Sequence, residues 1–130
     1  MISISTSANK KVYFASDQHL GAPNSKASFV REKKFLHWLD IVKKDAEAIF
    51  LLGDLFDFWF EYKTVVPRGF VRVLGKLAEI KDSGIPIYFF VGNHDLWMTD
   101  YFEKELNIPV YHSPQEFSIN NKKFLIGHGD

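Results

Sequence analysis

The sequence predicts an α/β fold built on a mainly parallel sheet, and two observations carry that prediction. Three buried-strand patterns, at 12–16, 48–52 and 86–91, alternate with two helical patterns, at 29–44 and 67–84. Strand, helix, strand, helix, strand is the order of successive βαβ units on a parallel sheet. At 130 residues the chain has the length of one domain with a substantial core.

The first ten residues read as a flexible polar tail, so the domain is expected to span residues 11–130. The strand at 12–16 is a short apolar run that ends in polar residues. The helix at 29–44 follows, because apolar residues keep helical spacing there and Ser28 is a suitable N-cap.

The second helix is bounded by residue types that are typical of helix ends. Pro67 suits its first turn, and Gly84 suits the position just after its last turn. The strand at 86–91 comes next. The remaining elements are a short helix at 101–106 and strands at 110–112, 116–119 and 123–126, with an Asn120-Asn121 turn joining the last two.

Composition excludes several classes of protein. Lys and Arg together number 16, as do Asp and Glu, and the basic residues are dispersed, so no nucleic-acid partner is expected. The lack of cysteine excludes disulfides, thiolate metal sites and cysteine nucleophiles. No apolar run approaches the ~20 residues of a membrane span, and the first residues lack a signal-peptide pattern. We therefore expect a cytoplasmic protein, which leaves room for association with a membrane surface.

Polar clusters follow four of the predicted strands, at the point where each strand ends. They are Asp17 and His19 in SDQHLG, Asp54 and Asp57 in GDLFD, Asn93, His94 and Asp95 in GNHD, and His128 and Asp130 in GHGD. Sites in parallel sheets form at the carboxyl ends of strands, so these side chains should converge. Carboxylate, imidazole and amide ligands without thiolate suit Mn²⁺, Fe²⁺, Zn²⁺ or Co²⁺, and one carboxylate can bridge two such ions. Any one residue alone is more often a cap or a turn former, but four clusters together predict a metal site.

This series of motifs resembles the calcineurin-like metallophosphoesterases. The matching motifs are Asp17-x-His19, Gly53-Asp54-x-x-Asp57, Gly92-Asn93-His94-Asp95 and Gly127-His128. Within that superfamily, SDQHLG, LLGDLFDFWFEY, GNHDLW and GHGD are most similar to the UDP-2,3-diacylglucosamine pyrophosphatases of lipid A biosynthesis. The resemblance implies a four-layer αββα sandwich. It also implies hydrolysis of the pyrophosphate bond of UDP-2,3-diacylglucosamine to UMP and lipid X, with two divalent ions that are usually Mn²⁺.

The resemblance also implies which residues hold the metals. Asp17 and His19 would hold the first ion, and Asn93 and His128 would hold the second. Asp54 would bridge both ions and so take part in catalysis. The substrate would be a lipid-bearing sugar nucleotide, reached at the cytoplasmic face of the inner membrane.

The remaining motif residues would act beside the metals. His94 would stabilise the transition state or serve as general acid, because charge builds on the phosphoryl oxygens and the leaving group. Asp95 would orient His94, and Asp57 and Asp130 would hold the metal ligands in position without binding the ions themselves. The best-known branch of the lipid A enzymes carries Arg at the position of His94, whereas GNHD is the general superfamily form.

The family pattern also continues beyond the fourth motif, with a G-H-x-H histidine pair and a second sheet. The chain thus corresponds to about the first half of the expected fold. We expect this half alone to hold an incomplete site and to be weakly active at best. It should also expose an apolar sheet face, which favours oligomer formation.

An aromatic run follows Asp54 and raises the question of what its side chains contact. Phe56 or Phe58 is expected to pack inward, whereas Trp59, Phe60 and Trp97 are candidates for a wall against the lipid part of the substrate. Two alternatives stay open at this point. One is a metallophosphoesterase for another phosphodiester or phosphomonoester, and the other is a non-catalytic binding module of the same fold.

Overall fold

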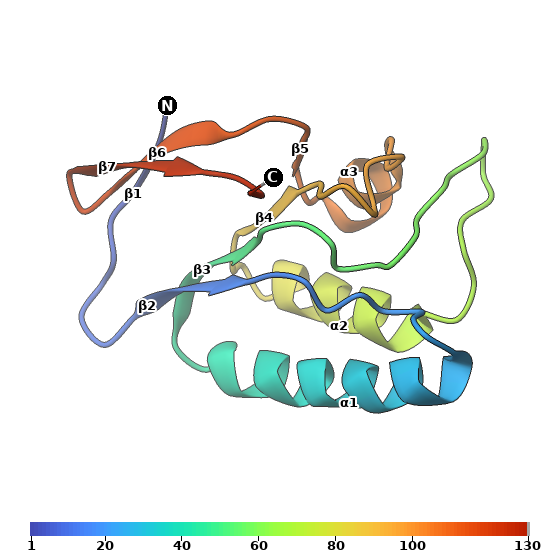
Figure 1. Cartoon of the computed structure of the whole chain (residues 1–130). Helices are drawn as coiled ribbons and strands as arrows, with labels where there is room; N and C mark the ends of the chain where they lie inside the picture. Colours follow the sequence, from blue (N-terminus) through green and yellow to red (C-terminus); the bar gives the residue numbers. More distant parts are fainter. Residues whose placement is uncertain (130) are drawn as a thin grey trace.

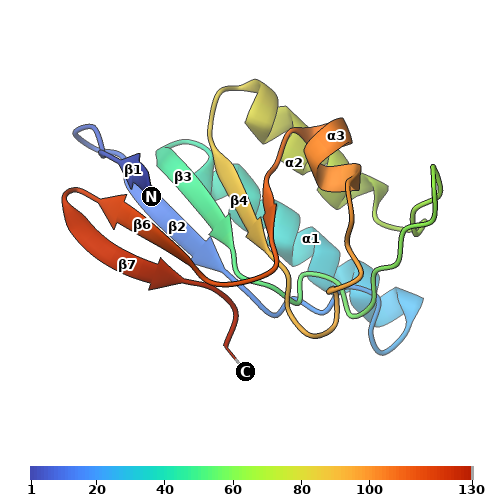
Figure 2. The same ribbon diagram turned by 90° about the horizontal axis from the view of Figure 1, so that it is seen from above.

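The computed structural model describes residues 1–129, which form three stacked layers (Figures 1 and 2). Helices α1 (Ser25–Val42) and α2 (Val71–Asp82) cover one face of a four-stranded sheet, and a three-stranded sheet covers the other face. The short helix α3 (Tyr101–Leu106) packs against α2. These layers are the helix, sheet and sheet of the expected αββα order. Within the described residues, no helix lies on the outer side of the small sheet.

The large sheet is entirely parallel, as the βαβ pattern predicts. Its strands run in the order β2-β3-β4-β5. Their bounds are β2 (Lys11–Ala15), β3 (Ala46–Leu51), β4 (Ile87–Phe90) and β5 (Val110–Tyr111). All four strands therefore end at the same edge, and the loops that leave this edge carry the first three polar clusters.

The small sheet has the order β1-β6-β7. Its strands are β1 (Ile2–Ile4), β6 (Gln115–Ile119) and β7 (Lys122–Ile126). The last two form an antiparallel hairpin through Asn120 and Asn121, which both have positive φ, at 53° and 66°. This is the backbone that a tight two-residue hairpin turn requires, so the predicted turn is confirmed.

Strand β3 is buried on both faces and anchors the fold. Ile49 and Leu51 point into the core beneath the helices, whereas Ala48 and Phe50 point into the core between the two sheets. Phe50 packs edge-on against Phe117 of β6, with ring centroids 4.9 Å apart. Full burial of a side chain of this size contributes about 2–3 kcal/mol, so the carboxyl end of β3 is held firmly in place.

The first residues are a strand rather than a tail, which corrects the sequence prediction. Ile4 is almost fully buried, and β1 pairs in parallel with β6, Ile4 standing opposite Ile119. Thr6 and Asn120, which are 114 positions apart, also exchange two hydrogen bonds of 2.9 Å. A run of only three residues carries no recognisable period, so its distant partner decides its conformation.

Both long helices begin elsewhere than predicted. Asn24, not Ser28, is the N-cap of α1, and its Oδ1 accepts a 2.9 Å hydrogen bond from the Ala27 amide. Ser28 lies one turn inside the helix, where its buried hydroxyl accepts a 2.6 Å hydrogen bond from the Gly21 amide. Helix α2 starts at Val71 rather than at Pro67, because the intervening Gly69 adopts a φ of +101°, which no α-helix contains.

Some apolar surface stays open on the sheets. Phe14 of β2 is 45% exposed, and Phe124 and Leu125 of β7 are 42% and 74% exposed. This matches the expected exposed sheet face, while self-association through it remains a prediction. None of the helices among residues 1–129 combines the length and the apolar character that crossing a membrane requires.

Candidate active site

The four polar clusters meet around one carboxylate. Asp54 follows β3 and is only 3% exposed. Its Oδ2 lies 3.1 Å from Nδ1 of His94, 3.5 Å from Nε2 of His128 and 3.8 Å from Nε2 of His19. These three imidazoles come from the loops after β4, β7 and β2, so the fold gathers side chains from four separate strands.

The loops around Asp54 have unusual backbone conformations. Asp17, His19 and Asp54 all have positive φ, at 64°, 49° and 55°. Such conformations cost about 1–3 kcal/mol each in non-glycine residues and concentrate at functional sites. The first loop is held to the second by two hydrogen bonds of 3.0 Å, from the Asp17 amide to the Gly53 carbonyl and from the His19 amide to the Asp54 carbonyl.

The side chains form two groups that could each hold a metal ion, and the two groups share Asp54. One group is Asp17, Asp54 and His128, and the other is His19, Asp54 and His94. Within each group, the atoms that could bind an ion lie within 4.8 Å of one another. A shared carboxylate between two ligand groups is the arrangement that bridges a pair of divalent ions.

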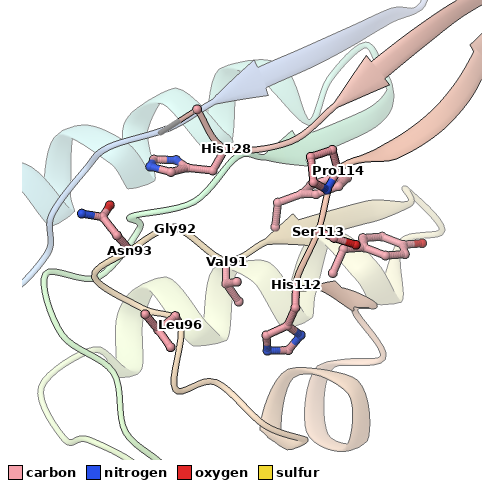
Figure 3. A pocket seen from close by; sticks show the side chains of 11 residues that line it. Val91, Gly92, Asn93, Leu96, His112, Ser113, Pro114 and His128 are labelled. Atoms are coloured by element: carbon pink, nitrogen blue, oxygen red, sulfur yellow. The ribbon is translucent and has the colours of Figure 1, made fainter.

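The ligand sets that the sequence resemblance implied remain predictions. Asp17 lies near both His128 and His19, with its Oδ1 3.6 Å from His19 Nε2, and His94 is as close to Asp54 as any other imidazole. Asn93 is exposed and lies on the same side of the neighbouring cleft as His128 (Figure 3).

The hydrogen-bonding partner of His128 fixes which of its nitrogens faces Asp54. Nδ1 lies 2.7 Å from the Leu52 carbonyl, which can only accept, so Nδ1 carries the proton. Nε2 therefore presents its lone pair towards Asp54, as a metal ligand must.

Asp54 itself is held in the charged form. Burial alone would raise its pKa, but hydrogen bonds from the amide and ring of His94 are the largest opposing contributions, and the pKa of Asp54 lies below its ordinary value. A metal-bridging carboxylate needs to be ionised, and this environment favours that form.

Asp95 does not orient His94, which corrects the predicted role. Its carboxylate is fully buried and accepts backbone hydrogen bonds from Gly92, Asp54, Leu55 and Phe56, at 2.7, 3.2, 3.0 and 3.4 Å. Burial raises the pKa of Asp95, and these amide donors oppose the rise. Asp95 thus ties the loop after β4 to the loop after β3.

The other two carboxylates predicted to support the ligands have different outcomes. Asp57 Oδ1 lies 3.4 Å from His19 Nδ1, on the ring edge away from Asp54, which suits a residue that orients a ligand. Asp130 lies outside the described residues. The role of Asp57 remains a prediction.

Gly92 lies against Asp54 so closely that no side chain fits. A Cβ built on Gly92 would overlap Asp54 Oδ1 and lie 2.7 Å from both its Cγ and its amide nitrogen. The Asp54 carboxylate is therefore packed against bare backbone, which explains the glycine in GNHD.

The aromatic run after Asp54 divides into buried and exposed side chains. Phe56 and Trp59 are fully buried, while Phe58 and Phe60 are 61% and 50% exposed. Trp59 therefore cannot form part of a lipid-facing wall, and that prediction is wrong for this residue. Phe60 pairs through a parallel β-bridge with Trp97, which is 56% exposed. The side chains of Phe60 and Trp97 are therefore exposed, as the predicted wall requires.

Sequence reasoning missed two residues that hold these loops. Arg31 of α1 donates from Nη2 to the carbonyls of His19, at 2.7 Å, and Ala22. Glu61 is 8% exposed and accepts hydrogen bonds from Trp59 and from the start of α3. A lone acidic residue inside an aromatic run was the available signal for Glu61, whereas Arg31 carries no local signal in the sequence.

A cleft of about 730 Å³ opens beside the ligand groups. Asn93 and His128 lie on one side of it, and His112, Ser113 and Leu96 lie around the rest (Figure 3). The cleft can therefore receive part of a molecule whose reacting group sits at Asp54.

Comparison with known proteins gives two findings. A family model described as calcineurin-like phosphoesterase matches residues 10–130. The UDP-2,3-diacylglucosamine hydrolase of Porphyromonas gingivalis is 47% identical over 120 residues, which are 92% of this chain and 46% of that protein. The protein of the same name from Haemophilus influenzae (strain PittGG) is 30% identical over 124 residues, which are 93% of this chain and 49% of that protein. The one from Ectopseudomonas mendocina is 33% identical over 98 residues, which are 75% of this chain and 40% of that protein. The chain spans about half the length of the curated relatives it matches.

Proposed function

Because this chain belongs to the calcineurin-like phosphoesterase family, we propose that the protein hydrolyses a phosphoric ester bond at a centre of two divalent metal ions around Asp54. The observation that carries this proposal is the shared carboxylate. Two groups of candidate ligands meet at Asp54, and its surroundings keep it ionised. Two ligand groups that each bound an ion independently would have no need to share one buried carboxylate.

The donor set fits divalent cations of the Mn²⁺ class, since it offers carboxylate and imidazole atoms and no thiolate. Asp17, His19, Asn93 and His128 would hold the ions on either side of Asp54. When bound, such ions polarise a phosphoryl oxygen and supply hydroxide as the nucleophile at neutral pH.

His94 is placed to act on the substrate. Its amide and its Nδ1 both hydrogen-bond to Asp54, at 2.8 and 3.1 Å, so backbone and ring are fixed together. Its side chain is nevertheless 43% exposed, which leaves much of the ring open to solvent. We assign His94 to donate a hydrogen bond to a phosphoryl oxygen or a proton to the leaving group.

The substrate that best fits these surroundings is UDP-2,3-diacylglucosamine, cleaved to UMP and lipid X. Relatives at up to 47% identity carry the name UDP-2,3-diacylglucosamine hydrolase. The exposed aromatic side chains Phe60 and Trp97 lie on the two loops that also hold Asp54 and His94. Apolar surface so near a phosphate-cleaving centre suits a substrate that carries acyl chains.

The test is to incubate the protein, at its full natural length and with Mn²⁺, with UDP-2,3-diacylglucosamine and to measure UMP. We expect UMP release, and a loss of at least about 10²-fold in the Asp54→Asn variant. The matched control is Asp82→Asn, an equal charge change at an exposed position at the end of α2, which should leave the rate unchanged. No UMP, with brisk hydrolysis of bis(p-nitrophenyl) phosphate, would move the assignment to another phosphodiester. Full activity of Asp54→Asn would overturn the metal centre itself.

A further inference from the structure

Two loops at the active-site edge hold each other through a reciprocal pair of buried carboxylates. We call residues 54–62, after β3, the aromatic loop, and residues 92–101, after β4, the histidine loop. Asp95 of the histidine loop accepts hydrogen bonds from three amides at the start of the aromatic loop. Glu61, near the end of the aromatic loop, accepts hydrogen bonds from three amides at the end of the histidine loop.

Glu61 is fully satisfied in this position. Its Oε1 accepts from the Thr99 hydroxyl at 2.6 Å and from the amides of Asp100 and Tyr101, both at 3.1 Å. Its Oε2 accepts from the Trp59 indole at 2.9 Å and from the Thr99 amide at 3.0 Å. All of these donors are neutral, and no basic side chain pairs with Glu61 among the described residues. The Glu61 carboxylate therefore binds hydrogen-bond donors from both loops.

The exposed aromatic side chains lie between these two attachments. Phe60 immediately precedes Glu61, and its backbone bridges to Trp97, which lies midway between Asp95 and Thr99. Both side chains are about half exposed, so core packing does not enclose them. The backbone therefore determines where they point, and the two carboxylates hold that backbone.

The two attachments differ in what they hold. Asp95 acts at the end that carries Asp54 and His94, so its loss would disturb the metal ligands. Glu61 acts at the far end, and none of its hydrogen bonds involves a candidate metal ligand. Glu61 can therefore control the aromatic side chains without controlling the reacting groups.

We propose that Glu61 is a positioning residue that sets Phe60 and Trp97 as an apolar ledge beside His94, and thereby sets the affinity for the acyl part of the substrate. The acyl-bearing identity of the substrate rests on the proposed function. Glu61 itself takes no part in bond cleavage. The same hydrogen bonds cap α3, whose own N-cap residue Asp100 makes no side-chain capping bond.

The test compares three single variants of the full-length protein with Mn²⁺. Glu61→Gln places an amide NH₂ where two or three donors now point. Thr99→Val removes the 2.6 Å hydroxyl contact from an exposed position with little risk to folding. Glu103→Gln is the control, an equal charge change at an exposed site on α3. Each is assayed with UDP-2,3-diacylglucosamine and with the small substrate bis(p-nitrophenyl) phosphate.

For Glu61→Gln we expect KM for the diacylated substrate to rise at least about tenfold, through loss of a preorganised surface, with kcat changed less than about twofold. Thr99→Val should shift the same parameter in the same direction by a smaller factor. Hydrolysis of bis(p-nitrophenyl) phosphate and the Mn²⁺ affinity should match those of Glu103→Gln. Equal losses on both substrates, or no change in KM, would overturn the proposal.

A binding measurement separates this proposal from the proposed function. Calorimetric titration with a short-chain diacyl phosphatidic acid should give a Kd at least about tenfold weaker for Glu61→Gln than for the wild type. If the wild type binds this lipid but releases no UMP, only the proposed function fails. If the wild type fails to bind it, or binds it no better than Glu61→Gln does, the apolar ledge itself is disproved.

Discussion

Replacing Gly92 by alanine should displace the central carboxylate of the site. The added methyl group would overlap Asp54 Oδ1 and lie 2.7 Å from Asp54 Cγ and from the Asp54 amide. Neither atom can move freely, because the Asp54 amide donates to the buried Asp95 and the carboxylate accepts 2.8 and 3.1 Å bonds from His94. One of these contacts must therefore break.

The magnitude follows from those contacts. Overpacking a filled site costs about 1–3 kcal/mol. Loss of a hydrogen bond to a charged group adds about 1.5–3 kcal/mol. We therefore expect Gly92→Ala to lower the free energy of unfolding by about 3–5 kcal/mol, a large part of the ~5–15 kcal/mol typical of a domain. Mn²⁺ affinity should fall with it, because the shared carboxylate no longer faces both ligand groups.

The assay is urea unfolding of the metal-free protein, followed by Trp fluorescence, with Mn²⁺ titration in the absence of urea. The control is Gly75→Ala in α2, where a Cβ would meet no atom within 4 Å. That change should raise stability by about 0.5–1 kcal/mol, because alanine suits a helix interior better than glycine. If Gly92→Ala unfolds within about 0.5 kcal/mol of the wild type and binds Mn²⁺ equally well, the close packing against Asp54 is not what the site depends on.

Three further predictions concern the carboxylates and the first helix. Asp95→Asn should lower the free energy of unfolding by about 2–4 kcal/mol in urea, because whichever oxygen becomes NH₂ then faces two amide donors. The control is Asp57→Asn at a half-exposed position, which should leave the free energy of unfolding almost unchanged. Equal effects of the two substitutions would contradict the role given to the Asp95 hydrogen bonds. Burial alone would raise the pKa of Glu61, but hydrogen bonds from Thr99, Trp59 and Tyr101 hold it below its ordinary 4.5, so its stabilisation is complete above that pH and is lost as the pH falls through the folded-state pKa. The difference in unfolding free energy between wild type and Glu61→Gln should therefore shrink below about pH 4.5, and a constant difference would refute this. Asn24→Ala should lower stability by about 1 kcal/mol through loss of the α1 cap; a thermal melt unchanged from the wild type would show that the cap is dispensable.

The convergence of the first three clusters was predictable because it depends on strand direction alone. Once β2, β3 and β4 are parallel, the residues that follow them must lie at one edge. The distribution of ligands between two groups was not predictable in this way. It depends on how each loop turns, and Asp17 and His19 turn through positive φ.

The misassigned residues share one physical cause. Asp95 and Trp59 were interpreted from their neighbours in the sequence, His94 and the aromatic run. Their actual partners lie on distant segments, where Asp95 accepts from the Asp54 amide and the Trp59 ring packs edge-on against Phe102 of α3, with ring centroids 5.8 Å apart. Contacts between segments about forty positions apart leave no local pattern.

The pairing of β1 with β6 has a consequence for how the molecule assembles during synthesis. The large sheet and both long helices can form from the chain up to Tyr111, which places Asp54 and His94 early. Strand β1 must wait unpaired until β6 emerges, and contacts between such distant positions form slowly. His128 follows later still. Among the described residues, the candidate ligand groups are therefore complete only after the main core has had the chance to form.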